Sequence, residues 1–294
     1  MLKVHPGPRR LRPTYGEHDR QPYQHIRPEP LSPTIGAEIN GVRLDHEIDA
    51  ATFDEIHQAL LEYKVIFFRD QDIAPEQHVG FARRFGALET HPFVPHRDGF
   101  PEVMVLKKND QIGGYENVWH SDVTWRLQPS LGSVLLAREV PALGGDTLFC
   151  DMYAAYDGLS ERLRASLDGL RAVHDFTRTF AKLLSPDELA KKQQEFPPAV
   201  HPVVRTHPET GRKGLYVNAA FTSHIVDMDP DESDRLLDRL YRQATVPEYQ
   251  CRFRWRQHSI AFWDNRAVQH YAASDYFPNP RVMERVTIVG DTPY

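Results

Sequence analysis

Two His-x-Asp tripeptides carry the residue types of a metal site, His96-Arg97-Asp98 and His120-Ser121-Asp122. Two histidines and one carboxylate on one face of an iron ion leave three positions open for a co-substrate and O2. Because side chains alternate along a strand, such a pair on a strand supplies two adjacent ligands, and a distant strand can supply the third. With 15 histidines in the chain, about one tripeptide is expected by chance, so context must separate the two. Pro95 and Gly99 favour a turn around the first, whereas residues 123–125 predict a strand after the second.

The C-terminal residues 282–289 predict a strand that brings two arginines to one side. Alternation places Arg281, Met283 and Arg285 on one face and apolar residues on the other. Arginines that point inward need anionic partners, because a buried unpaired charge is costly. A dianionic co-substrate and an anionic substrate would supply these partners. The alternative is that both arginines point to solvent and pair with Asp or Glu.

The surrounding pattern predicts many short strands with helices before and between them. Strands are expected at 65–68, 103–106, 123–125, 133–136, 147–149, 200–205, 215–217, 251–255, 260–263 and 282–289. Helices are expected around 53–63, from Pro75, over 151–170, in part of 181–197 and over 229–244, with a turn at 111–117. This order favours an antiparallel barrel or jelly roll decorated by helices.

Composition excludes several classes of protein. The net charge of -6 and the scattered basic residues give no nucleic-acid footprint. No apolar run suits a signal peptide or a membrane helix, so no membrane partner is expected. Two cysteines, Cys150 and Cys251, exclude a disulfide framework and predict a cytoplasmic location. Residues 1–30, rich in Pro and Arg, are expected to form a mobile tail before a single domain at 31–294.

Several ordered motifs resemble the taurine dioxygenase (TauD/TfdA) family from about residue 30 to the C-terminus. They are 35–39 (IGAEI), 119–124 (WHSDVT), 144–147 (GGDT), 201–208 (HPVVRTHP) and 263–272 (WDNRAVQHYA), followed by Arg281. The resemblance implies a double-stranded β-helix, a jelly-roll or cupin-like core, which agrees with the strand pattern.

The resemblance also implies the ligands of the metal and of the co-substrate. His120, Asp122 and His270 match the family's Fe(II) ligands. Thr147 and Arg281 match the groups that hold the distal carboxylate of 2-oxoglutarate. Arginine suits this role because its planar fork pairs with a carboxylate through two hydrogen bonds and stays charged.

The substrate side of the resemblance is less complete. Positions that line the family's sulfonate pocket are matched by His91, Phe180, Phe221 and Arg285. Val94 stands where taurine enzymes commonly carry Tyr, and Trp125 where they carry Phe, which puts recognition of taurine's ammonium group in question. The alternative for Phe180 and Phe221 is core packing. His174 and His201 are expected to be structural.

The implied function is a 2-oxoglutarate-dependent dioxygenase that uses Fe(II) and O2. It would hydroxylate the carbon next to the sulfonate of taurine or a related alkanesulfonate, releasing sulfite and an aldehyde with succinate and CO2. One alternative is the same chemistry on an alkyl sulfate or an aryloxy-carboxylate, and another is a non-catalytic, cupin-like metal-binding protein. The expected partner is a small anionic substrate. The sequence leaves open its identity and whether the chain forms a homo-oligomer.

Overall fold

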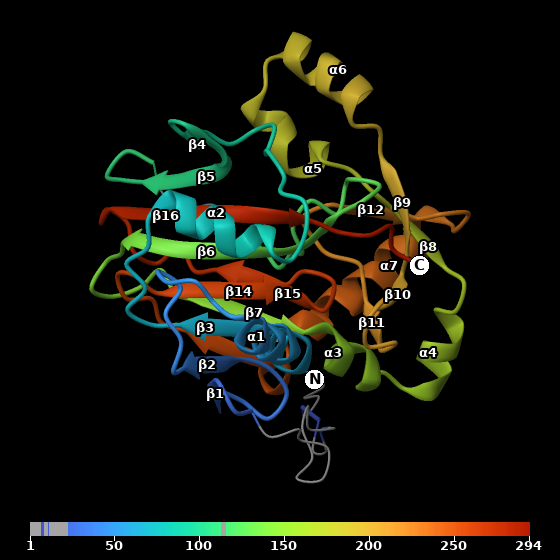
Figure 1. Ribbon diagram of the computed structural model, residues 1–294. Helices are drawn as coiled ribbons and strands as arrows, with labels where there is room; N and C mark the ends of the chain where they lie inside the picture. Colours follow the sequence, from blue (N-terminus) through green and yellow to red (C-terminus); the bar gives the residue numbers. More distant parts are fainter. Residues whose placement is uncertain (1–6, 9–10, 12–22, 113–115) are drawn as a thin grey trace.

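An eight-stranded sheet lies at the centre of the computed structural model, which describes residues 7–8, 11, 23–112 and 116–294 (Figure 1). In sheet order its strands are β1 (Arg27–Pro30), β2 (Ala37–Asn40), β3 (Val65–Phe68), β14 (Ile260–Asp264), β6 (Ser130–Glu139), β16 (Arg281–Val289), β5 (Phe100–Lys108) and β4 (His96–Arg97). Neighbouring strands are antiparallel except for β2 and β3, which are parallel.

A second, three-stranded sheet packs against one face of the first. Its order is β13 (Gln250–Phe253), β7 (Thr147–Asp151) and β15 (Val268–Ala272). Aromatic side chains fill the space between the two sheets. The rings of Phe67 and Phe253 stack with centroids 4.0 Å apart, and those of Phe149 and Trp263 lie 5.7 Å apart. The mainly β fold with flanking helices is therefore confirmed, and its two sheets face each other across a shared core.

Two helices cover the opposite face of the central sheet, α1 (Ala50–Tyr63) and α2 (Pro75–Arg83). The helix α1 begins where the Asp49 side chain accepts a hydrogen bond from the Thr52 N–H, and α2 has Pro75 in its first turn. Ile66 and Phe68 of β3 pack toward these helices, while Val65 and Phe67 pack toward the second sheet. All four residues are buried because the sheet is covered on both faces.

Buried His78 of α2 gives the fold a pH-dependent stability. Its Nε2 donates to the Val134 carbonyl oxygen at 2.9 Å, and burial lowers the pKa of His78 to about 4. The unfolded chain takes up this proton near pH 6.5 and the folded chain only near pH 4, so the free energy of unfolding falls as pH decreases through this window. Between pH 7 and pH 5 the loss from His78 is expected to be about 2 kcal/mol.

Chemical denaturation at pH 7 and pH 5 tests this prediction. We expect His78→Gln to lose about 2 kcal/mol less than the wild type between the two pH values. The exposed His46 is the control, and His46→Gln is expected to keep the wild-type dependence. Equal pH dependence of the wild type and His78→Gln would show that His78 is not the source.

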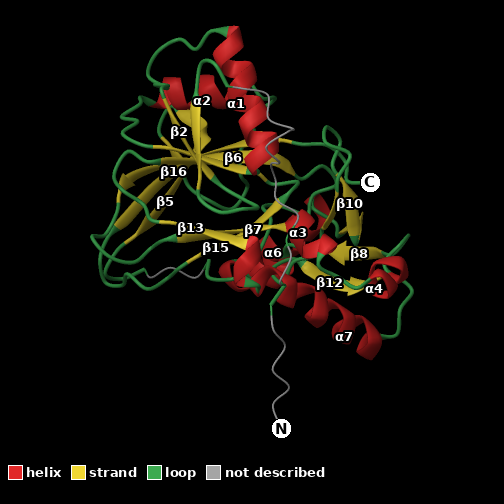
Figure 2. Ribbon diagram, turned by 90° about the horizontal axis from the view of Figure 1, so that it is seen from below, coloured by secondary structure: helices red, strands yellow, loops and turns green. Residues whose placement is uncertain are grey.

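The chain between β7 and β13 forms a smaller, mixed region at one end of the molecule (Figure 2). Its elements are α3 (Met152–Asp157), α4 (Glu161–Ser166), β8 (Arg171–His174), α5 (Thr177–Phe180), α6 (Pro186–Glu195), β9 (Ala199–Pro202), β10 (Val204–Thr206), β11 (Lys213–Leu215), β12 (Thr222–Ile225) and α7 (Pro230–Tyr241), with 3-10 turns at Ala181–Leu183, Arg242–Thr245 and Pro247–Tyr249. Strands β12, β8 and β9 pair in that order, and β10 pairs with β11. The helix α6 projects away from the sheets (Figure 1).

Three sequence predictions about the fold are wrong. Residues 122–125 form a turn, not a strand, and Val123 has φ 47°. The helix expected over 151–170 is two short helices, because α3 ends with Gly158 as its C-cap and Ser160 caps a new helix. The expected tail ends too late, since 27–30 form β1.

Some expectations concern residues that the structure does not describe. Most of the predicted tail, and residues 113–115 of the predicted turn at 111–117, lie outside the described residues. The turn predicted around His96 is confined to residues 98–99. His96 itself lies in β4 and pairs with Met104 of β5. None of the helices in the described part of the chain is long and apolar enough to cross a membrane.

Candidate active site

His120, Asp122 and His270 come together between the two sheets. One ligand atom of each lies within 4.8 Å of the others, and they form the one group of this kind among the described residues. The Nε2 atoms of His120 and His270 lie 3.8 and 3.9 Å from Oδ1 of Asp122. The backbones of the two histidines pair through hydrogen bonds of 3.1 and 2.8 Å. Two imidazoles and one carboxylate fit an iron site with open positions.

The hydrogen bonds and the electrostatics of this group suit metal binding. Nδ1 of His120 donates to the Val118 carbonyl oxygen at 2.8 Å, so its Nε2 offers a lone pair. Burial and the neighbouring His120 lower the pKa of His270 to about 3, which keeps its ring neutral. Burial alone would raise the pKa of Asp122, but Arg285 and the two imidazoles outweigh burial and hold this pKa below its usual range. Neutral imidazoles and an ionised carboxylate are the metal-binding forms.

Asp122 reaches the histidines from a turn and not from a strand. The Asp122 N–H donates to Oδ1 of Asn265 at 2.7 Å, and the Ser133 hydroxyl donates to Oδ2 of Asp122 at 3.2 Å. The sequence therefore paired His120 with Asp122 for the wrong structural reason. The other tripeptide lies apart from this group: Asp98 is exposed, and Nε2 of His96 donates to the His91 carbonyl oxygen at 2.9 Å.

A small cavity of about 60 Å³ is lined by His120 and His270 of the cluster and by both predicted co-substrate residues. Arg281 is 7% exposed, and the described part of the chain holds no carboxylate in an ion pair with it. Burial lowers the pKa of its guanidinium. Thr147 Oγ1 accepts a hydrogen bond from Trp255 Nε1 at 2.9 Å, so its own hydroxyl hydrogen stays available. A buried cation beside a hydroxyl donor suits the distal carboxylate of 2-oxoglutarate.

A larger cavity of about 650 Å³ adjoins the first and is lined by His120 and Asp122 of the cluster. All six residues predicted to bind substrate line it: His91, Val94, Trp125, Phe180, Phe221 and Arg285. The sequence did not predict other lining residues, namely Phe93, Pro95, Val105, Leu106, Ile112 and Val118. They lie in the β4–β5 hairpin and its flanking loops, where no motif marks them and only the topology brings them to the cavity.

Polar and aromatic groups divide the wall of this cavity. Arg285 lines both cavities, and its Nη1 donates to Asp122 Oδ1 at 2.9 Å. The Phe93 N–H donates to Nδ1 of His91 at 3.2 Å, which leaves the proton of that ring on Nε2. Burial and Arg285 lower the pKa of His91 to about 3, so His91 is a neutral donor. Phe180 stacks on Phe93 and Phe221 at 4.9 and 6.2 Å, forming an aromatic wall.

His174 and His201 lie behind the Asp122 turn. Nε2 of His201 is 2.9 Å from the carbonyl oxygens of both Thr124 and Arg126, and Nδ1 of His174 is 2.9 Å from the Thr124 hydroxyl. Burial lowers the pKa of both histidines. Both imidazoles therefore contact Thr124 of the turn, as expected for structural residues.

A family model and several known proteins match most of this chain. The model of the taurine catabolism dioxygenase TauD, TfdA family matches residues 27–287. A Pseudomonas putida protein named alpha-ketoglutarate-dependent sulfate ester dioxygenase is 39% identical over 90% of this chain and 89% of its own length. An alkylsulfatase from Acinetobacter baylyi is 36% identical over 92% of this chain and 87% of its own length.

Solved structures give the same result. A taurine dioxygenase from Burkholderia xenovorans matches with a TM-score of 0.80 and 40% identity, over 92% of this chain and 93% of that chain. The structure of AAD-2 in complex with Mn(II) and N-oxalylglycine matches with a TM-score of 0.79 and 31% identity, over 92% of this chain and 99% of that chain. The chain therefore belongs to the TauD/TfdA family, and it is a 2-oxoglutarate-dependent dioxygenase that uses iron.

Proposed function

We propose that this enzyme oxidises small sulfur oxyanions that carry an apolar chain, alkyl sulfate esters first and alkanesulfonates second. The observation that carries the proposal is the cavity of about 650 Å³, where Arg285 and His91 lie beside the His120–Asp122–His270 cluster and the remaining wall is largely aromatic and aliphatic. The two relatives named for sulfate esters support placing sulfates first. We further propose that the two facing sheets form a double-stranded β-helix.

The proposed roles follow from the position of each side chain. His120, Asp122 and His270 hold Fe(II), and iron with 2-oxoglutarate supplies the O2-dependent oxidation that yields succinate and CO2. Arg281 and Thr147 bind the distal carboxylate of 2-oxoglutarate and so fix its keto-acid end toward the metal.

The substrate is held by its charged end. Arg285 and the Nε2–H of His91 are placed to bind the oxyanion, while Phe180, Phe221 and Trp125 cover the chain and exclude water. Hydroxylation of the carbon bonded to the sulfate oxygen gives an unstable hemiacetal ester, which breaks its C–O bond to release sulfate and an aldehyde. The same step beside a sulfonate breaks the C–S bond and releases sulfite. One oxygen atom of O2 enters the substrate and the other enters succinate. The non-catalytic alternative is not favoured, because the relatives are named as dioxygenases.

Taurine's ammonium group has no free acid to bind in the described wall of the cavity. The two carboxylates in this wall already have cationic partners. Glu116 lies 2.7 Å from Lys108 Nζ, and Asp122 lies 2.9 Å from Arg285 Nη1. Val94 adds no hydroxyl. An apolar chain therefore suits this wall better than a charged amine, because an ammonium group without a partner is costly to desolvate.

A substrate panel tests the proposal. We expect kcat/KM for hexyl sulfate and pentanesulfonate to exceed that for taurine, with about a fourfold gain per buried CH2 group. Val94→Tyr is expected to shift the preference toward taurine by about 1 kcal/mol, since it restores a polar contact. Succinate, sulfate and sulfite release are measured for each substrate.

Leu31→Tyr, at an exposed position remote from the cavity, is the matched control and should keep the wild-type preference. A wild type selective for taurine, and unchanged by Val94→Tyr, would contradict the proposed substrate class. Sulfite without sulfate across the panel would place sulfonates first.

A further inference from the structure

The side chain of Asn265 forms hydrogen bonds with both backbone polar groups of Asp122, its N–H and its carbonyl oxygen. Asn265 is fully buried. Its Oδ1 accepts from the Asp122 N–H at 2.7 Å, and its Nδ2 donates to the Asp122 carbonyl oxygen at 2.9 Å and to the Ser130 carbonyl oxygen at 3.3 Å. We propose that Asn265 is a positioning residue that fixes the Asp122 carboxylate toward the metal by taking the place of a strand partner for this turn.

The turn needs such support because its next residue is strained. Val123 has φ 47°, in the left-handed region that L-residues with a branched Cβ avoid. Of the five non-glycine residues with positive φ in the described chain, it alone is β-branched. Strained conformations persist where the surrounding structure over-determines them. The two hydrogen bonds from Asn265 to the N–H and carbonyl oxygen of the preceding residue, Asp122, provide this constraint.

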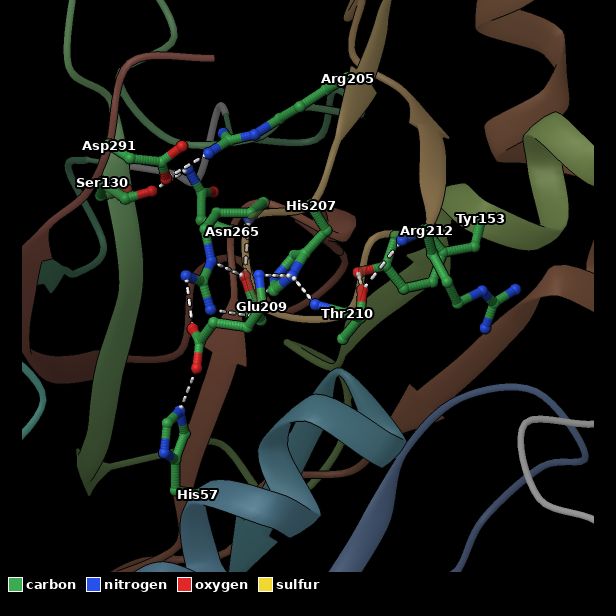
Figure 3. A network of polar contacts seen from close by, with 12 residues as sticks. His57, Ser130, Tyr153, Arg205, His207, Glu209, Thr210, Arg212, Asn265 and Asp291 are labelled. Atoms are coloured by element: carbon green, nitrogen blue, oxygen red, sulfur yellow. Dashed lines mark hydrogen bonds and ion pairs between the residues drawn. The ribbon is translucent and has the colours of Figure 1, made fainter. Parts of the chain in front are cut away.

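Asn265 is itself held in place by its neighbours. Its own N–H donates to the Leu131 carbonyl oxygen at 2.8 Å. The flanking Asp264 and Arg266 form a buried ion pair of 2.7 Å, and His207 Nε2 donates to Asp264 at 2.9 Å. Figure 3 shows Asn265 beside Ser130 and within this network, which continues through Glu209 to His57. The position of the Asn265 side-chain amide is therefore fixed by these contacts.

The turn links the metal site to the substrate cavity. Asp122 faces His120 and His270, while Val123 and Trp125 line the larger cavity. A turn released from Asn265 would relax at Val123 and move the carboxylate away from the two imidazoles. The consequence is a loss of metal affinity that exceeds any loss expected from a buried amide elsewhere in the fold.

The proposal rests on the assignment of His120, Asp122 and His270 as metal ligands, and Mn(II) titration of the full chain, followed by electron paramagnetic resonance, tests it. We expect Asn265→Ala to raise the Mn(II) Kd ten- to hundredfold, as loss of a ligand's supporting partner typically does. Gln71→Ala is the matched control. Gln71 is a buried amide that also makes three backbone hydrogen bonds, to Leu44, Arg69 and Val42, in the loop between β3 and α2. Its Mn(II) Kd is expected to stay within about twofold of the wild type.

A rescue variant separates positioning from general destabilisation. Val123→Gly removes the left-handed strain, so Asn265→Ala/Val123→Gly is expected to bind Mn(II) at least about threefold more tightly than Asn265→Ala. An unchanged Kd in Asn265→Ala, or a double variant that binds no more tightly, would overturn the proposal. If Asn265→Ala does not fold, Asn265→Ser takes its place in both comparisons. Asp122→Ala tests the metal-ligand assignment separately from the role of Asn265. Wild-type Mn(II) binding by Asp122→Ala would refute the metal site itself.

Discussion

The His270→Ala protein is expected to form no succinate and to lose most of its Fe(II) affinity. His270 contributes one of two imidazoles around Asp122, and its Nε2 lies 3.9 Å from Oδ1 of that carboxylate. Removal of one of three protein ligands leaves His120 and Asp122, which cannot define the facial geometry that keeps neighbouring positions open. Isothermal titration with Fe(II) under anaerobic conditions and a succinate assay with 2-oxoglutarate measure the two effects.

The second His-x-Asp tripeptide supplies the control for this prediction. Asp98 is exposed in the turn after β4 and takes no part in the metal group, so Asp98→Ala should bind Fe(II) and turn over as the wild type does. Retained activity in His270→Ala would refute the assigned ligand set. Equal losses in His270→Ala and Asp98→Ala would show that the assay reports general damage to the protein.

The sequence predicted the identity of the clustered residues better than the local structure that holds them. The family motifs bring His120, Asp122 and His270 to one place, and they do meet. The strand expected at 123–125 followed from Val and Trp, which favour strands. The residues form a turn instead, and the backbone of Asp122 is hydrogen-bonded to Asn265, a partner 143 residues away. A prediction from neighbouring residues alone cannot include such a long-range contact.

Other mismatches in the fold have the same origin. Pro28 and Pro30 argued against a strand, but β1 is an edge strand, where a missing N–H donor is tolerated. The helical pattern over 151–170 is continuous, but the C-cap at Gly158, where Tyr249 leaves no room for a Cβ, and the N-cap at Ser160 divide it. By contrast, the alternation in β16 predicted correctly that Arg281 and Arg285 share one face, and the structure shows that this face lines a cavity rather than solvent, which the alternation had left open. Periodicity decides which face a residue takes, whereas breaks and caps depend on distant neighbours.

Arg281→Ala is expected to raise the apparent KM for 2-oxoglutarate by a hundredfold or more. The guanidinium is 7% exposed and has no ion-pair partner in the described chain, so an incoming carboxylate meets a desolvated cation. Loss of such a charge-assisted pair costs about 2–5 kcal/mol, and tenfold corresponds to about 1.4 kcal/mol. Arg281→Lys keeps the charge but loses the fork, so its KM should lie between those of the wild type and Arg281→Ala.

Although Arg281→Ala should weaken 2-oxoglutarate binding, it should not lower the thermal stability of the ligand-free protein. Because Arg281 is a buried charge without a carboxylate partner in the described residues, its removal relieves a desolvation cost. We therefore expect the thermal midpoint of Arg281→Ala without 2-oxoglutarate to equal or exceed that of the wild type, and the increase in midpoint on adding 2-oxoglutarate to disappear. Arg252→Ala is the control, since Arg252 is exposed and pairs with Asp146 at 2.6 Å outside the cavity. An Arg281→Ala protein that keeps both the wild-type KM and the wild-type shift would mean that another group binds the distal carboxylate.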